Sequence, residues 1–168
     1  MNVHTHESIT ESDVKQIAED LVPIFSSREM QTDRDRKVPA ENIELLAESG
    51  LLGIFRAKKW GGQELSMRAH VDAVSTVAKG CQATAWVLGV YHAHDYIAGH
   101  LSEQAQEEIY STGTIQAIAA VIGPRGKAVR RKDGSYLLSG FWPFASGNAA
   151  SEWLLLGTEV FDEEGNKL

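Results

Sequence analysis

The chain has 168 residues, of which 43% are hydrophobic and 23% are charged, and its formal net charge is −7. This length and composition fit one or two globular domains with an apolar core. The negative charge argues against nucleic acid or an anionic membrane surface as the main partner.

The single cysteine, Cys81, excludes an intramolecular disulfide, which suits a reducing compartment. The N-terminal residues lack the basic and apolar regions of a signal peptide. No apolar run reaches the length that a membrane span needs. We therefore expect a cytoplasmic protein without a membrane segment.

The first two thirds of the sequence predict helices. Apolar residues repeat at helical spacing after Thr10, which we expect to be an N-cap. The charged residues 28–37 then form either a solvated continuation or a loop. A second helix is expected from Pro39 to Gly50.

Three further segments continue the helical pattern. Ser66 predicts the cap of a third helix, which carries Met67, Val71, Val74 and Ala78 on one apolar face. Residues 81–99 are apolar nearly all round, which is typical of a helix at the centre of a bundle. Ser102 predicts the cap of a short acidic helix.

The periodicity changes after residue 113. Residues 114–123 form an apolar run typical of a buried strand, and Asp133-Gly134 predicts a hairpin between two more strands. Another strand is expected at 151–161. Helices followed by strands indicate an α+β fold and exclude a doubly wound parallel sheet. So few strands cannot close a barrel or sandwich alone, so we expect further chain or a partner.

Several motifs of known chemistry do not occur in the sequence. It has no G-x-G-x-x-G, P-loop, cysteine pair, HExxH or G-x-S-x-G. His92 and His94 are two residues apart and fall on different faces of a helix. We therefore expect no metal site.

The stretch FWPFASGNAASEW, residues 141–153, places bulky aromatics beside a Ser-Gly step at the entry to a strand. One interpretation is an ordinary bulge in a sheet. The other is a surface against which a flat ligand lies. The residues alone leave both open.

An ordered set of segments carries a family resemblance. They are ESGLLGIFRAKKWGGQEL, an ATAW helix with a histidine, LSEQAQEEIY, and GPRGKAVRRKDGSYLLSGFWPFASGNAASEWLLLG. Over about residues 10–160 this set resembles the acyl-CoA dehydrogenase superfamily, specifically its flavin-dependent monooxygenase branch. That branch holds the oxygenase components of two-component aromatic hydroxylases and dibenzothiophene-type monooxygenases. The dehydrogenases' Thr-Glu before the proline is absent from AAVIGPRGKA, which favours the monooxygenase branch.

The resemblance implies a domain organisation. Residues 1–112 correspond to the N-terminal helical domain, and residues 113–168 to part of an antiparallel middle β-domain. The family's C-terminal four-helix bundle has no counterpart in the chain. We therefore expect an N-terminal fragment that is inactive alone and belongs to a homotetramer at full length.

The resemblance also implies an activity. A separate reductase supplies reduced FMN or FAD, which reacts with oxygen to give a C4a-hydroperoxide that hydroxylates a small aromatic or heteroaromatic substrate. The alternatives are an FAD-dependent acyl-CoA dehydrogenase and a non-catalytic interaction module.

By the same resemblance, four residues contact the flavin. Trp142 and Phe144 form an apolar wall beside the isoalloxazine ring. Ala145 and Ser146 match the family segment that contacts the ring near N5 and O4. The alternative is a packed strand with a Ser-Gly bulge.

Two residues of the 81–99 helix are assigned to the substrate. His94 falls where the branch places a catalytic histidine facing the substrate or the peroxide, and a neutral imidazole there can relay a proton. Trp86 is expected to line the substrate pocket. The alternative for both is a place in the core.

Overall fold

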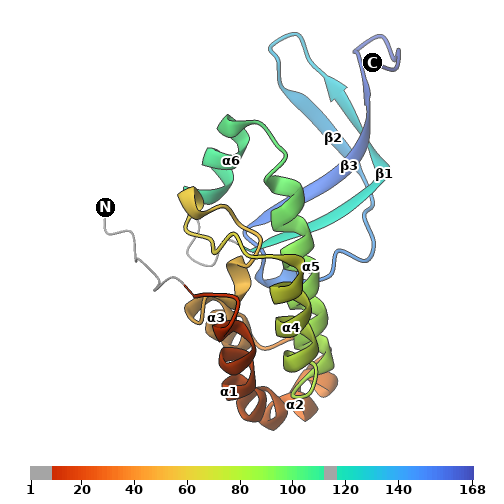
Figure 1. The fold of residues 1–168 in the computed structure, drawn as a ribbon. Helices are drawn as coiled ribbons and strands as arrows, with labels where there is room; N and C mark the ends of the chain where they lie inside the picture. Colours follow the sequence, from red (N-terminus) through yellow and green to blue (C-terminus); the bar gives the residue numbers. More distant parts are fainter. Residues whose placement is uncertain (1–8, 112–116) are drawn as a thin grey trace.

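The structure, a computed structural model, describes residues 9–111 and 117–168. A helical half comes first and a three-stranded sheet follows, as Figure 1 shows. The predicted α+β class is thereby confirmed. The helices are α1 (Asp13–Ser27), α2 (Glu29–Asp35), α3 (Ala40–Glu48), α4 (Met67–Val77), α5 (Gln82–Ala98) and α6 (Glu103–Tyr110), with short 3-10 turns η1 (Leu51–Gly53), η2 (Lys58–Trp60) and η3 (Asn148–Ala150). The strands are β1 (Ile118–Arg130), β2 (Tyr136–Gly140) and β3 (Trp153–Phe161).

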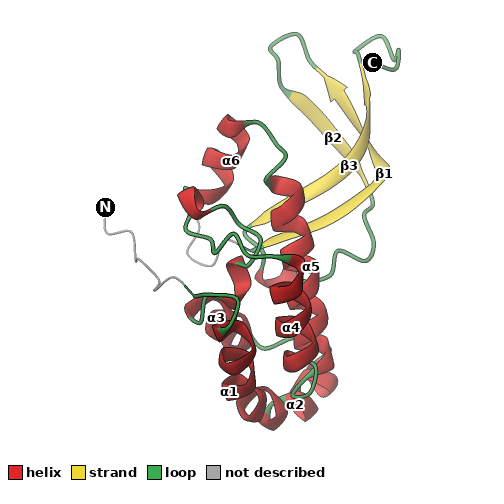
Figure 2. Ribbon diagram, viewed as in Figure 1, coloured by secondary structure: helices red, strands yellow, loops and turns green. Residues whose placement is uncertain are grey.

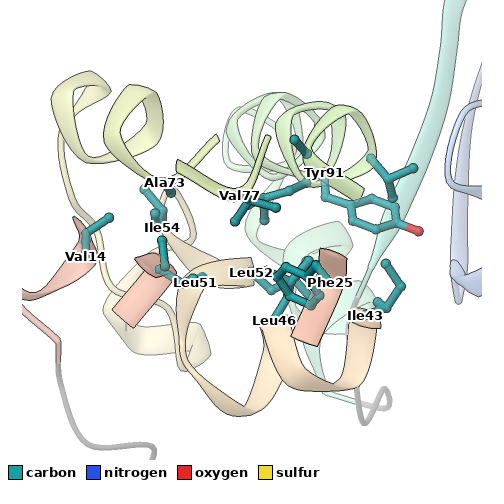
Figure 3. Close-up of a cluster of buried hydrophobic side chains, with 14 of the residues drawn as sticks. Val14, Phe25, Ile43, Leu46, Leu51, Leu52, Ile54, Ala73, Val77 and Tyr91 are labelled. Carbon is teal, nitrogen blue, oxygen red and sulfur yellow. The ribbon is translucent and has the colours of Figure 1, made fainter. Parts of the chain in front are cut away.

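One apolar core holds the helical half together (Figure 3). Its buried members include Phe25 of α1, Leu46 of α3, Leu51 of η1, Val77 of α4 and Tyr91 of α5. Full burial of a large apolar side chain contributes about 1.5–3 kcal/mol. Because each of these side chains comes from a different element, their burial draws all five elements to a common centre.

The buried face of α4 agrees only in part with the apolar face expected from the sequence, since Val74 and Ala78 pack against the core. Met67 and Val71 are 64% and 51% exposed, whereas Ala69 and Ala73 are fully buried. α1 packs against α4 and buries its own Ala18 as well. Small side chains allow two helix backbones to approach closely, so the two alanines are buried with Val77, whereas Met67 and Val71 remain exposed.

Two of the predicted helix caps are confirmed. The Ser66 hydroxyl accepts a hydrogen bond from the Arg68 amide at 3.1 Å, and the Ser102 hydroxyl accepts one from the Ala105 amide at 3.3 Å. Each bond satisfies an amide that the first turn of a helix leaves unpaired. These caps fix where α4 and α6 begin.

The first helical region differs in detail from the prediction. α1 begins at Asp13, three residues after Thr10, whose amide and hydroxyl both donate to the Asp13 carboxylate. Of the charged residues 28–37, most belong to the separate short helix α2, which ends where Arg36 turns left-handed. None of the helices in the described ranges combines the length and the apolarity needed to cross a bilayer.

The sheet is mixed rather than wholly antiparallel (Figure 2). β1 pairs with β2 in the predicted hairpin around Asp133-Gly134, and it pairs with β3 in parallel. The two strands expected on either side of Gly123-Pro124 are one continuous strand, β1. A register shift between Val121 and Gly126 in the pairing with β3 absorbs the Gly-Pro step.

The strand order β2-β1-β3 determines the path of the chain between β2 and β3. These two strands lie on opposite sides of β1, so residues 141–152 must pass from one edge of the sheet to the other. A parallel pair always requires such a crossover connection. The stretch singled out in the sequence is therefore the crossover loop, and β1, which it passes, contacts α5.

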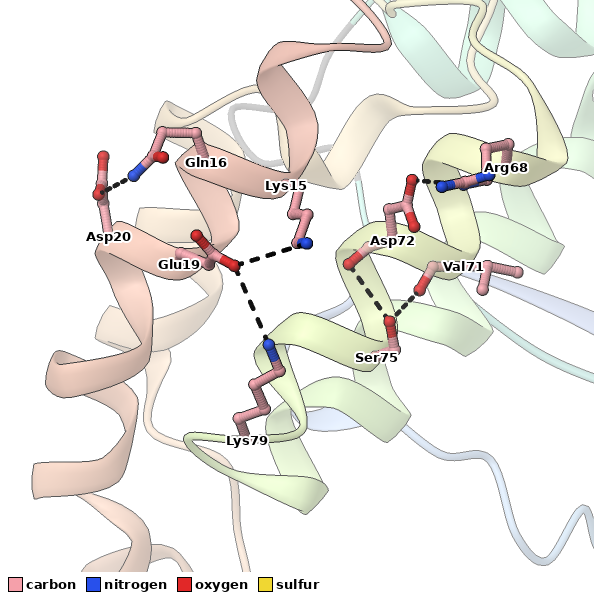
Figure 4. Close-up of polar contacts among 9 residues, drawn as sticks. All are labelled: Lys15, Gln16, Glu19, Asp20, Arg68, Val71, Asp72, Ser75 and Lys79. Carbon is pink, nitrogen blue, oxygen red and sulfur yellow. Dashed lines mark hydrogen bonds and ion pairs between the residues drawn. The ribbon is translucent and has the colours of Figure 1, made fainter.

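The surface ion pairs of α1, one within the helix and one to the region just after α4, contribute little to stability. Figure 4 shows Lys15 of α1 and Lys79, just beyond α4, both near the carboxylate of Glu19, each at 4.0 Å. All three side chains are more than 40% exposed. Exposed pairs of this kind are worth about 0–1 kcal/mol, so apolar packing carries the contact between α1 and α4.

A buried ion pair, together with a tyrosine hydroxyl, joins α5 to two other segments. The Arg56 guanidinium lies 3.1 Å from the Asp95 carboxylate, and the two side chains are 7% and 2% exposed. The hydroxyl of Tyr110, from α6, donates to the same carboxylate at 3.0 Å. Burial raises the pKa of Asp95, while Arg56 and Tyr110 act in the opposite direction. The contact links the segment after η1 to α5 and α6.

We predict that Asp95→Ala lowers the free energy of unfolding by about 3–5 kcal/mol, because it removes the carboxylate from a buried guanidinium. Urea unfolding measures this loss. The matched control is Glu103→Gln, which breaks the exposed pair with Lys59 and should change stability little. Similar losses in the two variants would contradict the assignment of Asp95 as a structural centre.

Candidate functional site

The crossover loop is clamped to α5 at Gly147. The Tyr91 hydroxyl donates to the Gly147 carbonyl at 2.6 Å, and the Ser151 hydroxyl donates to the same oxygen at 2.9 Å. Gly147 has a φ of 83°, and a Cβ there would lie 2.6 Å from the Tyr91 ring. Only glycine suits this backbone and this close approach. Burial raises the pKa of Tyr91 to about 12, so its hydroxyl stays a donor at neutral pH.

Trp142 fixes the start of the loop to the sheet. Its indole lies across Gly126 and Gly140, which are paired between β1 and β2, and a Cβ on either glycine would overlap the ring. The indole N–H donates to the Gly157 carbonyl at 2.9 Å. Trp142 is half-buried in this position, with a clear structural role. Its predicted contact with a flavin stays a prediction.

Phe144 projects from the loop. Its side chain is 91% exposed, and its φ of 64° puts a bulky residue in the left-handed region. Such a conformation costs about 1–3 kcal/mol and is often found at binding sites. The neighbouring Ala145 and Ser146 are half-buried. The loop therefore presents an aromatic ring outward beside a small residue and a hydroxyl.

A cleft of about 570 Å³ lies beside the loop. Residues 146–150 form one side, residues of α2 and the turn after it form another, and the first turns of α5 also line the cleft, with Trp86 among them. Its volume falls within the usual range for small-molecule sites.

Trp86 and Ser146 meet at this cleft. The indole N–H of Trp86 donates to the Ser146 hydroxyl oxygen at 3.2 Å, across 60 residues of sequence. Trp86 is 65% exposed. The structure thus brings together one residue predicted to bind substrate and one predicted to bind cofactor.

His94 lies two turns further along α5 and is not among the residues that line the cleft. Its Nδ1 is 2.7 Å from the Ile118 carbonyl, so Nδ1 carries the proton and Nε2 keeps its lone pair. Burial lowers the pKa of His94, which keeps the ring neutral near pH 7. Eight residues of helix place it about 12 Å along the axis from Trp86.

His92 is a core residue, because both of its ring nitrogens are engaged. Nε2 is 2.7 Å from the Leu51 carbonyl and must donate, so Nδ1 accepts from Nδ1 of His70 at 2.9 Å. The side chain is fully buried. Of the two histidines, only His94 keeps a ring nitrogen available for chemistry. Within the ranges that the structure describes, no group of three or more His, Cys, Asp or Glu residues is placed to hold a metal ion.

Sequence reasoning missed Tyr91 and Gly147 as parts of the site. The Ser-Gly step did indicate a turn, but nothing in an apolar helix marks which residue will hold that turn. The clamp depends on the packing of α5 against the crossover loop.

A family model for the N-terminal domain of acyl-CoA dehydrogenases matches residues 4–113. The chain belongs to this family. Among curated acyl-CoA dehydrogenase-like relatives, the oxygenase component of p-hydroxyphenylacetate 3-hydroxylase from Acinetobacter baumannii is 32% identical over 148 residues, covering 88% of this chain and 35% of the relative. The oxygenase component of an FADH(2)-dependent resorcinol hydroxylase from Rhizobium sp. is 32% identical over 135 residues, which cover 80% of this chain and 33% of the relative.

Among solved structures of acyl-CoA dehydrogenase-like proteins, the HsaA monooxygenase from M. tuberculosis matches with a TM-score of 0.86 and 25% identity, covering 95% of this chain and 43% of that one. These relatives confirm the predicted resemblance to the monooxygenase branch. The chain spans about a third of the length of the two curated relatives.

The pKa of His92 predicts a pH dependence of stability for this acyl-CoA dehydrogenase family domain. Burial, followed by the charges of His70 and Arg56, lowers this pKa to about 3, against about 6.5 in an unfolded chain. Because the pKa of His92 is lower in the folded chain than in the unfolded chain, its contribution to the free energy of unfolding is fully present above pH 6.5. This contribution is lost as the pH falls towards 3. The slope reaches about 1.4 kcal/mol per pH unit.

Urea unfolding between pH 7 and 4.5 measures this slope. His92→Gln keeps an amide donor for the Leu51 carbonyl but does not titrate, so its stability should fall less steeply with pH. His100→Gln, at an exposed histidine just beyond α5, leaves His92 in place and is the control. Equal slopes in all three proteins would show that His92 does not control the acid response.

Proposed function

We propose that this chain is the N-terminal part of a reduced-flavin-dependent monooxygenase that hydroxylates an aromatic or heteroaromatic substrate. The observation that carries the proposal is the cleft at which Trp86 of α5 meets Ser146 of the crossover loop. The oxygenase names of the relatives support it. Because the chain spans a third of those relatives, the activity is proposed for a polypeptide that also holds the counterpart of their remaining length.

The loop residues fit a flavin. Phe144 offers an exposed apolar ring, and Ala145 leaves room for a flat ligand to approach the backbone. Among the described residues, no acceptor takes the hydroxyl proton of Ser146, so a ligand can take it. Ser146, which lines the cleft, and its neighbours Phe144 and Ala145, which do not, would hold the ring, and Trp142 would fix the loop that carries them. Reduced flavin, when bound, supplies the activation of oxygen.

Three residues of α5 divide the remaining tasks. Trp86 covers part of the cleft with an indole, which limits the access of water to a bound ring. Tyr91 holds the loop in place through Gly147. His94 offers an unprotonated Nε2, which can accept a proton from a phenol or an indole and return it.

Several finer features belong to the same proposal. The flavin is FMN or FAD, and the name of the resorcinol hydroxylase relative supports the reduced FAD form. The oxygenase components among the relatives favour a separate reductase as partner. We also propose a cytoplasmic homotetramer that binds neither membranes nor nucleic acid. Its helical and β domains divide near residues 112 and 113, a boundary outside the described ranges.

Oxygen consumption tests the function. The complete encoded polypeptide is mixed with chemically reduced FMN or FAD, and hydroxylated product is assayed against a panel of phenols and indoles. The proposal expects product formation coupled to oxygen uptake. Reduction of a bound flavin by an acyl-CoA would instead identify a dehydrogenase, the other chemistry of the family. Failure to bind flavin in either redox state would favour a non-catalytic module.

A substitution at His94 separates its proposed role in proton transfer from its hydrogen bond to the Ile118 carbonyl. His94→Asn retains an N–H where Nδ1 donates to the Ile118 carbonyl, but it removes Nε2. We predict that hydroxylation slows by about 10²–10⁴-fold, while flavin affinity and stability change little. The single-turnover rate of product formation measures the effect, and His100→Asn, just beyond the end of α5, is the control. An unchanged rate would remove His94 from the reaction.

A further inference from the structure

The hydrogen bond between Trp86 and Ser146 has a fixed direction. An indole N–H can only donate, whereas a serine hydroxyl has one proton and two acceptor lone pairs. At 3.2 Å the Ser146 oxygen therefore accepts from Trp86. One lone pair of the hydroxyl is used, and its own proton must point elsewhere.

Among the described residues, no group accepts that proton. Ser146 is half-buried and lines the cleft. The hydroxyl therefore keeps its proton and one lone pair for a ligand in the cleft. A ligand acceptor, such as a carbonyl oxygen or an unprotonated ring nitrogen, would take the proton that no described residue takes.

The hydrogen bond, rather than packing, orients Trp86. With 65% of the side chain exposed, few neighbours restrain the indole. The backbone of Ser146, by contrast, is held from the next residue, because Tyr91 and Ser151 both donate to the Gly147 carbonyl. Replacing Trp86 should thus release the hydroxyl of Ser146 without moving the loop.

We propose that Trp86 is a positioning residue that occupies one lone pair of the Ser146 hydroxyl and so orients its proton towards an acceptor atom of the flavin ring. This inference rests on the proposed function, since the flavin is its ligand. It gives Trp86 a role beyond lining a substrate pocket. Trp86 acts on the cofactor through Ser146, and the same contact couples α5 to the crossover loop.

A ligand-free measurement tests the contact itself. The chain has four tryptophans and therefore four indole N–H signals in a ¹⁵N-labelled sample. Trp86→Phe identifies the signal of Trp86 by its loss. Ser146→Ala should shift that signal, whereas Ser146→Thr, which keeps a hydroxyl, should largely restore it. A Trp86 signal that is the same in all Ser146 variants would overturn the proposal.

A double-mutant cycle tests the effect on the ligand. Affinities for FMN and FAD, oxidised in air and reduced under nitrogen, are measured for Trp86→Phe, Ser146→Ala and the double variant of the complete polypeptide. Trp86→Phe should weaken binding of the preferred flavin by about 3- to 10-fold, the range of one hydrogen bond. In the Ser146→Ala background the same change should have little effect.

Trp60→Phe is the matched control, because the Trp60 indole also donates to a side chain, that of Gln106, and neither residue lines the cleft. It should leave flavin affinity unchanged. Additive losses from Trp86 and Ser146 would overturn the positioning role while leaving the flavin function intact. Absence of flavin binding by the unaltered protein, in both redox states, would overturn both.

Discussion

The ion pair between Arg56 and Asp95 is the contact on which the arrangement of the site depends most directly. It is buried, it includes the Tyr110 hydroxyl, and it joins α5 to the segments before and after it. Asp95 follows His94 in the same helical turn. A buried ion pair adds little net stability compared with apolar packing, but removing one partner is strongly destabilising. We infer that it helps to set the axial position of α5, which carries Trp86, Tyr91 and His94.

Other buried polar contacts act along the same helix. Thr84 accepts from Asn42 of α3 at 3.0 Å, and His92 bonds the Leu51 carbonyl of η1 and the ring of His70 in α4. With Asp95, these residues point inward at successive levels of α5, each towards a different segment. Apolar packing alone allows small slips between helices, whereas a misplaced buried polar group loses its partner at a cost of about 1–3 kcal/mol. We infer that these contacts specify the register of α5.

Local chemistry made much of the fold predictable. In the sequence, Ser66 and Ser102 indicate where two helices begin, Gly50 indicates the end of α3, and Asp133-Gly134 indicates the hairpin. The predictions that were wrong concerned features that depend on contacts between residues far apart in the sequence. The alanine face of α4 is buried because α1 comes close to it, and β1 continues through Gly123-Pro124 because the pairing with β3 shifts register there.

The same distinction applies to the site. The resemblance supplied Trp86, His94 and the loop residues, but the pairing of Trp86 with Ser146 spans 60 residues and follows only from the crossover. Since β3 must pair on the far side of β1 from β2, residues 141–152 have to pass the end of the sheet where β1 meets α5. A hairpin between β2 and β3 would have kept this loop at one edge, away from the helix. The parallel pairing of β1 with β3 is thus the topological reason that a loop and a helix can share one cleft.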